Sequence, residues 1–148
     1  MMDLNGVTAL VTGAGSGMGA ATAKALADRG ARVAVVDLNL ESAQQTADSI
    51  KGLALAADVS SSESVEAALQ QVVDELGAPR VVVSCAGIAA ASRIVGREGP
   101  HELDLYQRVI NVNLVGTFNV LRITAERMSQ LEPVAKSGAR GVIVNSAS

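Results

Sequence analysis

The chain has 148 residues, a formal net charge of −3 and 49% hydrophobic residues. This composition indicates a folded domain with a buried core, and its mild acidity offers no basic surface to nucleic acid or to anionic membranes. One cysteine and one histidine supply no ligand cluster for a metal, and no apolar run is long enough to span a bilayer. The first residues lack the pattern of a targeting segment, so we expect a cytoplasmic protein.

Five short apolar runs alternate with segments of helical periodicity. The runs cover residues 7–12, 32–37, 53–57, 81–86 and 141–146. Continuous apolar runs of this length are typical of a parallel sheet that is buried on both faces. Right-handed crossovers between such strands place helices on both faces. The predicted fold class is therefore α/β, a doubly wound parallel sheet with five strands in this chain.

The segments between the runs predict four helices, over residues 17–29, 40–50, from Ser60 onward, and 103–131. Ser60 and Glu63 have the spacing of a capping box at the start of the third helix. Gly30, Gly52 and Gly77 follow the first three helices, where glycine commonly ends a helix. In the fourth, a four-three-four-three spacing predicts that one apolar stripe faces the sheet: Leu114, Phe118, Leu121, Ala125 and Met128.

A glycine-rich loop, residues 13–19, follows the first apolar run. Gly13 allows a sharp turn off the strand, and Gly17 allows the backbone to approach a pyrophosphate. Gly19 removes the side chain that would hold the next helix away from the sheet. The helix N-terminus favours an anion, and Asp37 ends the second run. This order of strand, loop, helix, strand and acid predicts a dinucleotide-binding unit.

The loop reads TGxxxGxG from Thr12 to Gly19, and it resembles the loop of the short-chain dehydrogenase/reductase family, which has a Rossmann-type fold. The resemblance implies cofactor contacts from Gly13, Ser16, Gly17, Met18 and Gly19. A carboxylate at Asp37 can accept hydrogen bonds from both adenosine-ribose hydroxyls and repels a 2′-phosphate. Ser16 and Leu38 occupy the positions where a basic residue would hold that phosphate. We therefore predict NAD rather than NADP.

Two further strand ends match the family. The resemblance implies that the Asp58 carboxylate takes the exocyclic amine of adenine while the Val59 backbone reads the ring. Taken alone, Asp58 is a common turn or cap residue. Cys85, Ala86 and Gly87 occupy the place of the family's Asn-Ala-Gly segment, whose backbone contacts the cofactor ribose. Cysteine replaces the asparagine; an inert core cysteine is the simpler interpretation, and a catalytic thiol is the alternative.

Asn113 and Ser148 are the predicted catalytic residues. The resemblance implies that Asn113 holds a water in a proton relay and that Ser148 holds the substrate carbonyl or hydroxyl. Asn111 and Ser146 are the competing candidates. Two asparagines within a helix are also explained by a capped kink, because asparagine is a poor residue for a helix interior.

The family's catalytic tyrosine, with a lysine four residues later, has no counterpart here. Tyr106 is the one tyrosine in the sequence, and Ile110 stands four residues after it. A base within reach of the alcohol is needed for this chemistry. We therefore expect residues 1–148 to be the NAD-binding portion of a longer single-domain enzyme, truncated after the fifth strand. We expect no hydride transfer from this chain alone and weak NAD binding at most.

Residues 85–89, 108–120 and 141–145 resemble the type-2 3-hydroxyacyl-CoA dehydrogenase subgroup of the family. This resemblance implies an NAD-dependent oxidoreductase acting on a secondary alcohol, with a 3-hydroxyacyl-CoA, a small ketone or a steroid as the open substrate choices. It also implies a homo-oligomer, a dimer or tetramer, for the full-length protein. The alternative from another class is a non-catalytic dinucleotide-binding module.

Overall fold

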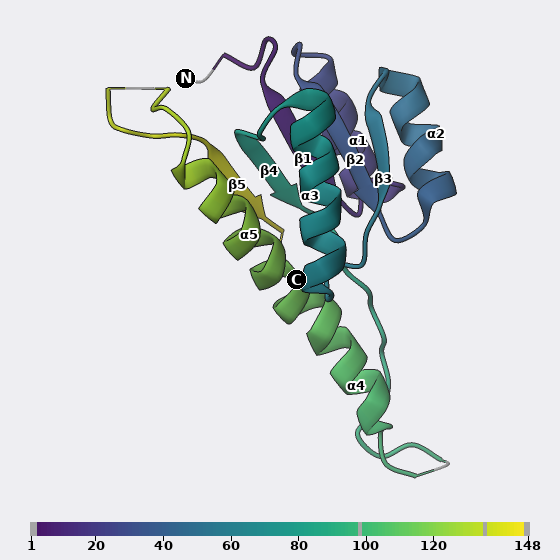
Figure 1. Ribbon diagram of the computed structural model, residues 1–148. Helices are drawn as coiled ribbons and strands as arrows, with labels where there is room; N and C mark the ends of the chain where they lie inside the picture. The colour runs from purple at the N-terminus through teal and green to yellow at the C-terminus, as the bar shows by residue number, and fades with distance from the viewer. Residues whose placement is uncertain (1–2, 98, 135, 147–148) are drawn as a thin grey trace.

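The computed structural model describes residues 3–97, 99–134 and 136–146. Its centre is one parallel sheet with the strand order β3-β2-β1-β4-β5 (Figure 1). The strands are β1 (Thr8–Thr12), β2 (Arg32–Asp37), β3 (Leu53–Ala56), β4 (Val81–Ser84) and β5 (Val142–Asn145). The predicted five-stranded α/β fold is confirmed.

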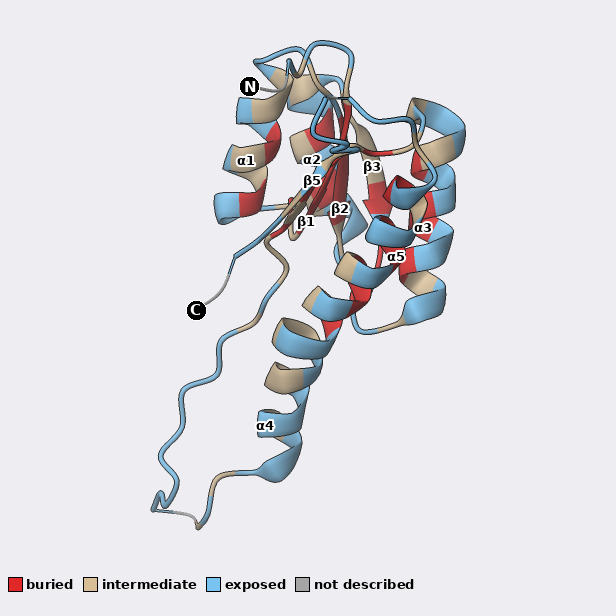
Figure 2. Cartoon of the chain, turned by 90° about the vertical axis from the view of Figure 1, so that its left-hand side faces the viewer, coloured by how far each residue is buried: buried red, intermediate tan, exposed pale blue. Residues whose placement is uncertain are grey.

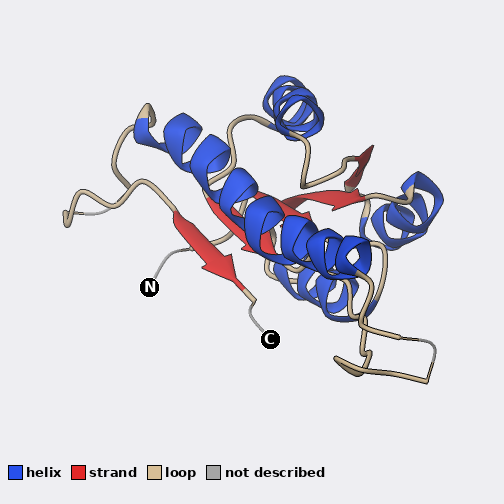
Figure 3. Cartoon of the chain, turned by 90° about the horizontal axis from the view of Figure 1, so that it is seen from below, coloured by secondary structure: helices blue, strands red, loops and turns tan. Residues whose placement is uncertain are grey.

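Helices cover both faces of the sheet (Figure 3). The helices α1 (Gly17–Ala27) and α2 (Leu40–Ile50) share one apolar core with Val33 and Val35 of β2. The helices α3 (Ser62–Leu76) and α5 (Thr117–Ser129) share the other core with Ala34 and Val36. Alternate residues of one strand therefore enter opposite cores, as the two-residue period of a strand requires.

The start of α3 differs from the prediction. Ser61, not Ser60, caps α3, because its hydroxyl oxygen accepts a hydrogen bond from the Ser64 N–H at 3.3 Å. The Ser60 hydroxyl instead donates to Asp58 Oδ1 at 2.6 Å. Gly77 follows α3 with φ of +80°, and α2 ends at Ile50, both as expected. The residue after α2 with a positive φ is Lys51, at +56°, rather than Gly52. That conformation is costly for a residue with a Cβ.

The fourth predicted helix is a rod with three parts. It begins with α4 (Leu103–Ile110), continues through the π-helical segment η1 (Asn111–Gly116) and ends with α5. Figure 2 shows that α4 and the chain leading to it project from the body of the molecule, and no residue of α4 is buried. We call residues 88–110 the arm. No helix in the described ranges is both long and apolar enough to cross a membrane.

The predicted sheet-facing stripe of this rod is wrong for most of its members. Leu114 is 65% exposed and Phe118 62% exposed, and Met128 is the one member that is buried. The face turned to the protein instead combines small, polar and apolar residues: Gly116, Asn119, Val120, Ile123 and Thr124. Gly116 has a physical reason to be there, since a Cβ at this position would lie 2.6 Å from Val59 Cγ2.

Candidate cofactor-binding site

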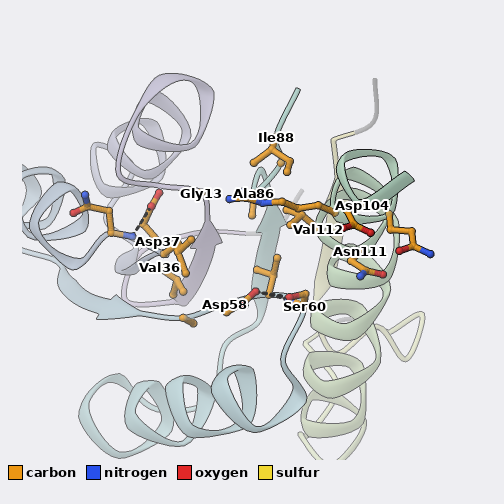
Figure 4. Close-up of a pocket in the computed structure, with 17 residues that line it drawn as sticks. Gly13, Val36, Asp37, Asp58, Ser60, Ala86, Ile88, Asp104, Asn111 and Val112 are labelled. Carbon is orange, nitrogen blue, oxygen red and sulfur yellow. Dashed lines mark hydrogen bonds between the residues drawn. The ribbon is translucent and has the colours of Figure 1, made fainter. Parts of the chain in front are cut away.

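A cleft of about 1030 Å³ lies where the strands of the sheet end (Figure 4). Its walls come from the segments that follow β1 to β4 and from the arm and η1: Gly13, Val36 to Asn39, Ala57 to Ser60, Ala86 to Ile88, Asp104, Gln107, Arg108, Asn111 and Val112. The chain reverses direction across the sheet at β1, which has β2 on one side and β4 on the other. Open α/β sheets bind ligands at such a switch point.

The glycine-rich loop is packed as tightly as its sequence suggests. Gly13 has φ of +63°, and a Cβ there would lie 2.7 Å from the backbone of Ala86. A Cβ on Gly19 would lie 2.1 Å from the Gly13 carbonyl oxygen. The predicted turn at Gly13 and the close approach at Gly19 are therefore both present, and together they bring the start of α1 against the loop.

The first turn of α1 is open to solvent. Ser16, Gly17 and Met18 are exposed, and nothing within the described chain lies within 4 Å of a Cβ built on Gly17. Ser16 occupies the N-cap position, but its side chain makes no capping hydrogen bond to the described residues. The first N–H groups of this helix are thus available to an anion, and the helix dipole favours negative charge there.

Asp37 ends β2 with its carboxylate fixed by two backbone groups. Asp37 Oδ2 accepts a hydrogen bond from Gly15 N–H at 2.9 Å, and Oδ1 accepts one from Asn39 N–H at 3.0 Å. A carboxylate oxygen can accept more than one hydrogen bond, so both oxygens keep capacity for a ligand hydroxyl. Gly15 is a position that sequence reasoning did not single out; a Cβ there would lie 2.9 Å from Asp37 Cγ.

Asp58 and Val59 form the opposite wall. Asp58 Oδ1 accepts hydrogen bonds from the Ser60 N–H at 2.9 Å and from the Ser60 hydroxyl. Val59 is buried, and its carbonyl accepts a hydrogen bond from Asn119 Nδ2 at 2.9 Å. The sequence analysis did not identify Asn119. A polar residue among apolar neighbours in a helix could have indicated it.

The segment after β4 is tied to β1. Cys85 N–H donates to the Thr12 carbonyl at 3.1 Å, and Ala86 N–H donates to the Thr12 hydroxyl at 3.3 Å. Ala86 and Gly87 line the cleft. Cys85 is half-buried and packs against the core beneath α1 and α2. No group of three potential metal ligands occurs within the described residues.

Of the predicted catalytic residues, Asn113 is described and Ser148 lies outside the described residues. Asn113 Oδ1 accepts from Ile88 N–H and Asn113 Nδ2 donates to the Ile88 carbonyl, both at 2.9 Å. The amide of Asn113 therefore holds the segment after β4, while Asn111 lines the cleft. The competing Ser146 donates its hydroxyl to the Ser84 carbonyl at 2.8 Å. The catalytic roles of these residues stay predictions.

The residues of the cleft fit a dinucleotide. Gly13 and the anchored Asp37 line the cleft. Gly19 and the exposed start of α1, with its free N–H groups, do not line it but follow the same loop. The cleft volume of about 1030 Å³ is slightly above the roughly 300–1,000 Å³ range of small-molecule and cofactor sites, so an extended cofactor has room. An extended ligand with a central anion and a hydroxyl-rich sugar would contact all three features.

Known proteins share this arrangement. The chain is 46% identical to 3-hydroxyacyl-CoA dehydrogenase type-2 of Bos taurus, over 99% of this chain and 57% of the bovine protein. The human protein of the same name is 41% identical with the same coverage. D-threitol dehydrogenase of Mycolicibacterium smegmatis is 40% identical over 98% of this chain and 54% of that protein. The chain thus spans little more than half the length of these curated relatives.

A solved structure and a family model agree with these relatives on the fold. The crystal structure of ribose-5-phosphate isomerase from Brucella melitensis 16M matches with a TM-score of 0.85 and 34% identity, over 99% of this chain and 53% of that one. Its name describes a different reaction, which is expected because one fold supports several chemistries. The model for short chain dehydrogenases matches residues 7–148. The chain therefore belongs to the short-chain dehydrogenase family, whose cofactor is NAD or NADP.

Proposed function

We propose that the full protein uses NAD and transfers a hydride between this cofactor and a secondary alcohol. The observation that carries the choice of NAD is the anchored carboxylate of Asp37, which lines the cleft at the end of β2. Two backbone N–H groups donate to it and fix its direction. A ribose with free 2′ and 3′ hydroxyls can donate to it, whereas a 2′-phosphate would place like charges together.

Residues of this chain position the walls of the cleft for this role. When bound, the nicotinamide would supply the acceptor for the hydride. Asn113 holds Ile88, and through it the segment after β4, at the cleft wall. The free N–H groups of α1 are suited to the pyrophosphate. Asp37 and Asp58 lie on either side of the space proposed for adenosine.

For the substrate class, we propose a 3-hydroxyacyl-CoA. Support comes from the similarity to the bovine and human 3-hydroxyacyl-CoA dehydrogenases type-2. D-threitol dehydrogenase is similar over the same part of the chain, so a small polyol is the competing substrate among secondary alcohols. The alternative from the sequence, a dinucleotide-binding module without catalysis, needs only the fold and the cleft.

A homo-oligomeric state, dimer or tetramer, remains a prediction for the full-length protein. The exposed stripe with Leu114 and Phe118 supports it, because apolar side chains of this size are usually covered. The accessible surface of the chain is 8902 Å², whereas a compact monomer of this mass is expected to expose roughly 7,000 Å². The chain therefore has surface that contacts with more protein could bury. The cytoplasmic location expected from the sequence is likewise a prediction.

The test is a hydride-transfer assay on the protein made from its natural gene. Absorbance of the reduced cofactor, NADH or NADPH, would be followed at 340 nm with 3-hydroxybutyryl-CoA or threitol as substrate and with NAD or NADP as cofactor. We expect turnover with the thioester and NAD. Turnover restricted to threitol would overturn the substrate class, and NAD binding without turnover on any alcohol would favour the binding module. The 148-residue chain, assayed in parallel, is expected to be inactive.

A further inference from the structure

Asn119 is a buried polar residue of α5 that contacts a wall of the cleft without lining it. We propose that Asn119 is a positioning residue for the adenine end of the cleft. Its side chain fixes the backbone of residues 58–60 in the conformation that receives a purine. This inference rests on the proposed binding of a dinucleotide and adds a residue to it that neither the loop motif nor the strand ends indicate.

The orientation of the Asn119 amide follows from its partners. Asn119 Oδ1 accepts from Arg122 Nε at 3.1 Å, from Arg122 Nη2 at 2.8 Å and from the Ser62 hydroxyl at 3.1 Å. A guanidinium group only donates hydrogen bonds, so the oxygen of the amide must face Arg122. The NH₂ group must then face the Val59 carbonyl, at 2.9 Å. Arg122 also donates to the Ser62 hydroxyl at 2.7 Å, which closes the network onto α3.

Val59 is held by α5 at two points. Its carbonyl is bound by Asn119, and its side chain fits against Gly116, where a Cβ would lie 2.6 Å from Val59 Cγ2. Among the residues that the structure describes, none accepts a hydrogen bond from the Val59 N–H. That donor and the Asp58 carboxylate, which Ser60 orients, are the polar groups that this wall can offer to a purine edge. A donor beside an acceptor is the pattern that an adenine edge complements.

Loss of the Asn119 amide would release the peptide bond after Val59. It would leave the start of α1, where we expect the pyrophosphate to bind, unchanged. The Val59 carbonyl is buried against α5, and a buried carbonyl without a partner favours conformations in which it reaches water. The segment 58–60 would then have to be reordered when a purine binds. The glycine-rich loop makes no hydrogen bond to Asn119, Arg122 or Ser62 among the described residues, so binding of a phosphate group there should be little affected.

The variant Asn119→Asp isolates this role. The carboxylate keeps the size of the side chain and the acceptor for Arg122 and Ser62, but it cannot donate to Val59. Thr124→Val is the matched control, because Thr124 is also buried in α5 and, among the residues that the structure describes, its hydroxyl bonds only the helix carbonyls of Val120 and Leu121. Both variants remove one buried hydrogen-bond donor from the same helix. Asn119→Asp also places a carboxylate oxygen next to the Val59 carbonyl, so only this variant alters the wall of the cleft.

The experiment is titration calorimetry of AMP and of inorganic pyrophosphate with the protein from its natural gene, joined with amide hydrogen exchange of the free protein. In Asn119→Asp we expect AMP affinity to fall about tenfold, equivalent to about 1.4 kcal/mol. Pyrophosphate affinity should be unchanged, and exchange should speed up at residues 57–61 but not at 13–19. Thr124→Val should alter neither affinity.

The outcomes separate this inference from the proposed function. Unchanged AMP affinity and unchanged exchange at residues 57–61 in a folded Asn119→Asp protein would overturn the inference while NAD binding by the wild type stands. Failure of the wild type to bind NAD and AMP would overturn both. If Asn119→Asp does not fold, Arg122→Leu, which removes the group that orients the amide, should still lower AMP affinity about threefold; no change there would also overturn the inference.

Discussion

Replacing Gly19 with alanine should destabilise the protein more than replacing either of two other glycines, Gly17 or Gly87. A Cβ at Gly19 would lie 2.1 Å from the Gly13 carbonyl oxygen, whereas an ordinary carbon–oxygen contact is about 3.3 Å. The start of α1 or the loop must therefore move by about 1 Å. Overpacking of this kind costs about 3 kcal/mol of unfolding free energy.

The two comparison variants separate space from backbone conformation. Gly17 has open space around its Cβ but φ of +52°, so Gly17→Ala should cost about 1–2 kcal/mol through strain in the left-handed region alone. Gly87 is free of such strain, and the nearest atom to its Cβ, Asn113 Oδ1, lies at 3.4 Å. Gly87→Ala should therefore change stability by less than about 0.5 kcal/mol.

Urea unfolding of the 148-residue chain, followed by circular dichroism, gives the three free-energy differences when the m-values agree. The expected order of destabilisation is Gly19, then Gly17, then Gly87. A Gly19→Ala protein as stable as Gly87→Ala would refute the argument that α1 meets the loop without room for a methyl group. Equal losses at Gly19 and Gly17 would show that the close contact at Gly19 costs no more than the positive φ at Gly17, which would also contradict the predicted order.

Three other predictions concern stability and use the same assay. Asp37→Ala should destabilise the chain by about 2 kcal/mol, because two backbone N–H groups lose a carboxylate and the one on Gly15 is partly buried; a loss under about 0.5 kcal/mol, typical of a plain surface site, would show that Asp37 does not hold the loop. Lys51→Gly should stabilise the chain by up to about 1 kcal/mol, since glycine relieves the positive φ at the end of α2; a loss would contradict this. Phe118→Ser should change stability by less than about 0.5 kcal/mol while Ile123→Ala costs about 2–4 kcal/mol; the reverse order would restore the stripe expected from the sequence.

The strands and the cofactor loop could be predicted from sequence because each has one dominant physical cause. A strand buried on both faces must be apolar throughout, and β2 reads Arg-Val-Ala-Val-Val-Asp with four consecutive buried residues. The space at Gly13 and at Gly19 is too small for a Cβ, so glycine is the one residue that fits at either position. The role of Asp37 as a ligand for the ribose could be predicted because this acidic residue ends β2. In each case the local sequence and the global fold require the same residue.

The orientation of the last helix could not be predicted, because its most apolar stripe is not its buried one. Leu114 and Phe118 are exposed, whereas Asn119 and Thr124 are buried. Hydrophobic periodicity assigns the apolar face to the core, and it fails where close packing selects small residues and hydrogen bonds satisfy buried polar ones. The π-helical turn at Asn111–Gly116 also changes the phase between the two halves of the rod.

The start of α3 shows the same limit on a smaller scale. The spacing of Ser60 and Glu63 matches a capping box, but three serines stand in a row and each can cap. Asp58 decides between them, since it accepts hydrogen bonds from the Ser60 backbone and hydroxyl. Ser61 is then left to cap the helix. That choice depends on a side-chain contact that the helical pattern does not encode.

The central claim is that the cleft beside Asp37 binds NAD in preference to NADP. Titration calorimetry of both dinucleotides with the protein from its natural gene tests it most directly. We predict that NAD binds about a hundredfold more tightly, because a 2′-phosphate next to the fixed carboxylate should cost about 2.7 kcal/mol of binding free energy. Equal affinities, or tighter binding of NADP, would contradict the account.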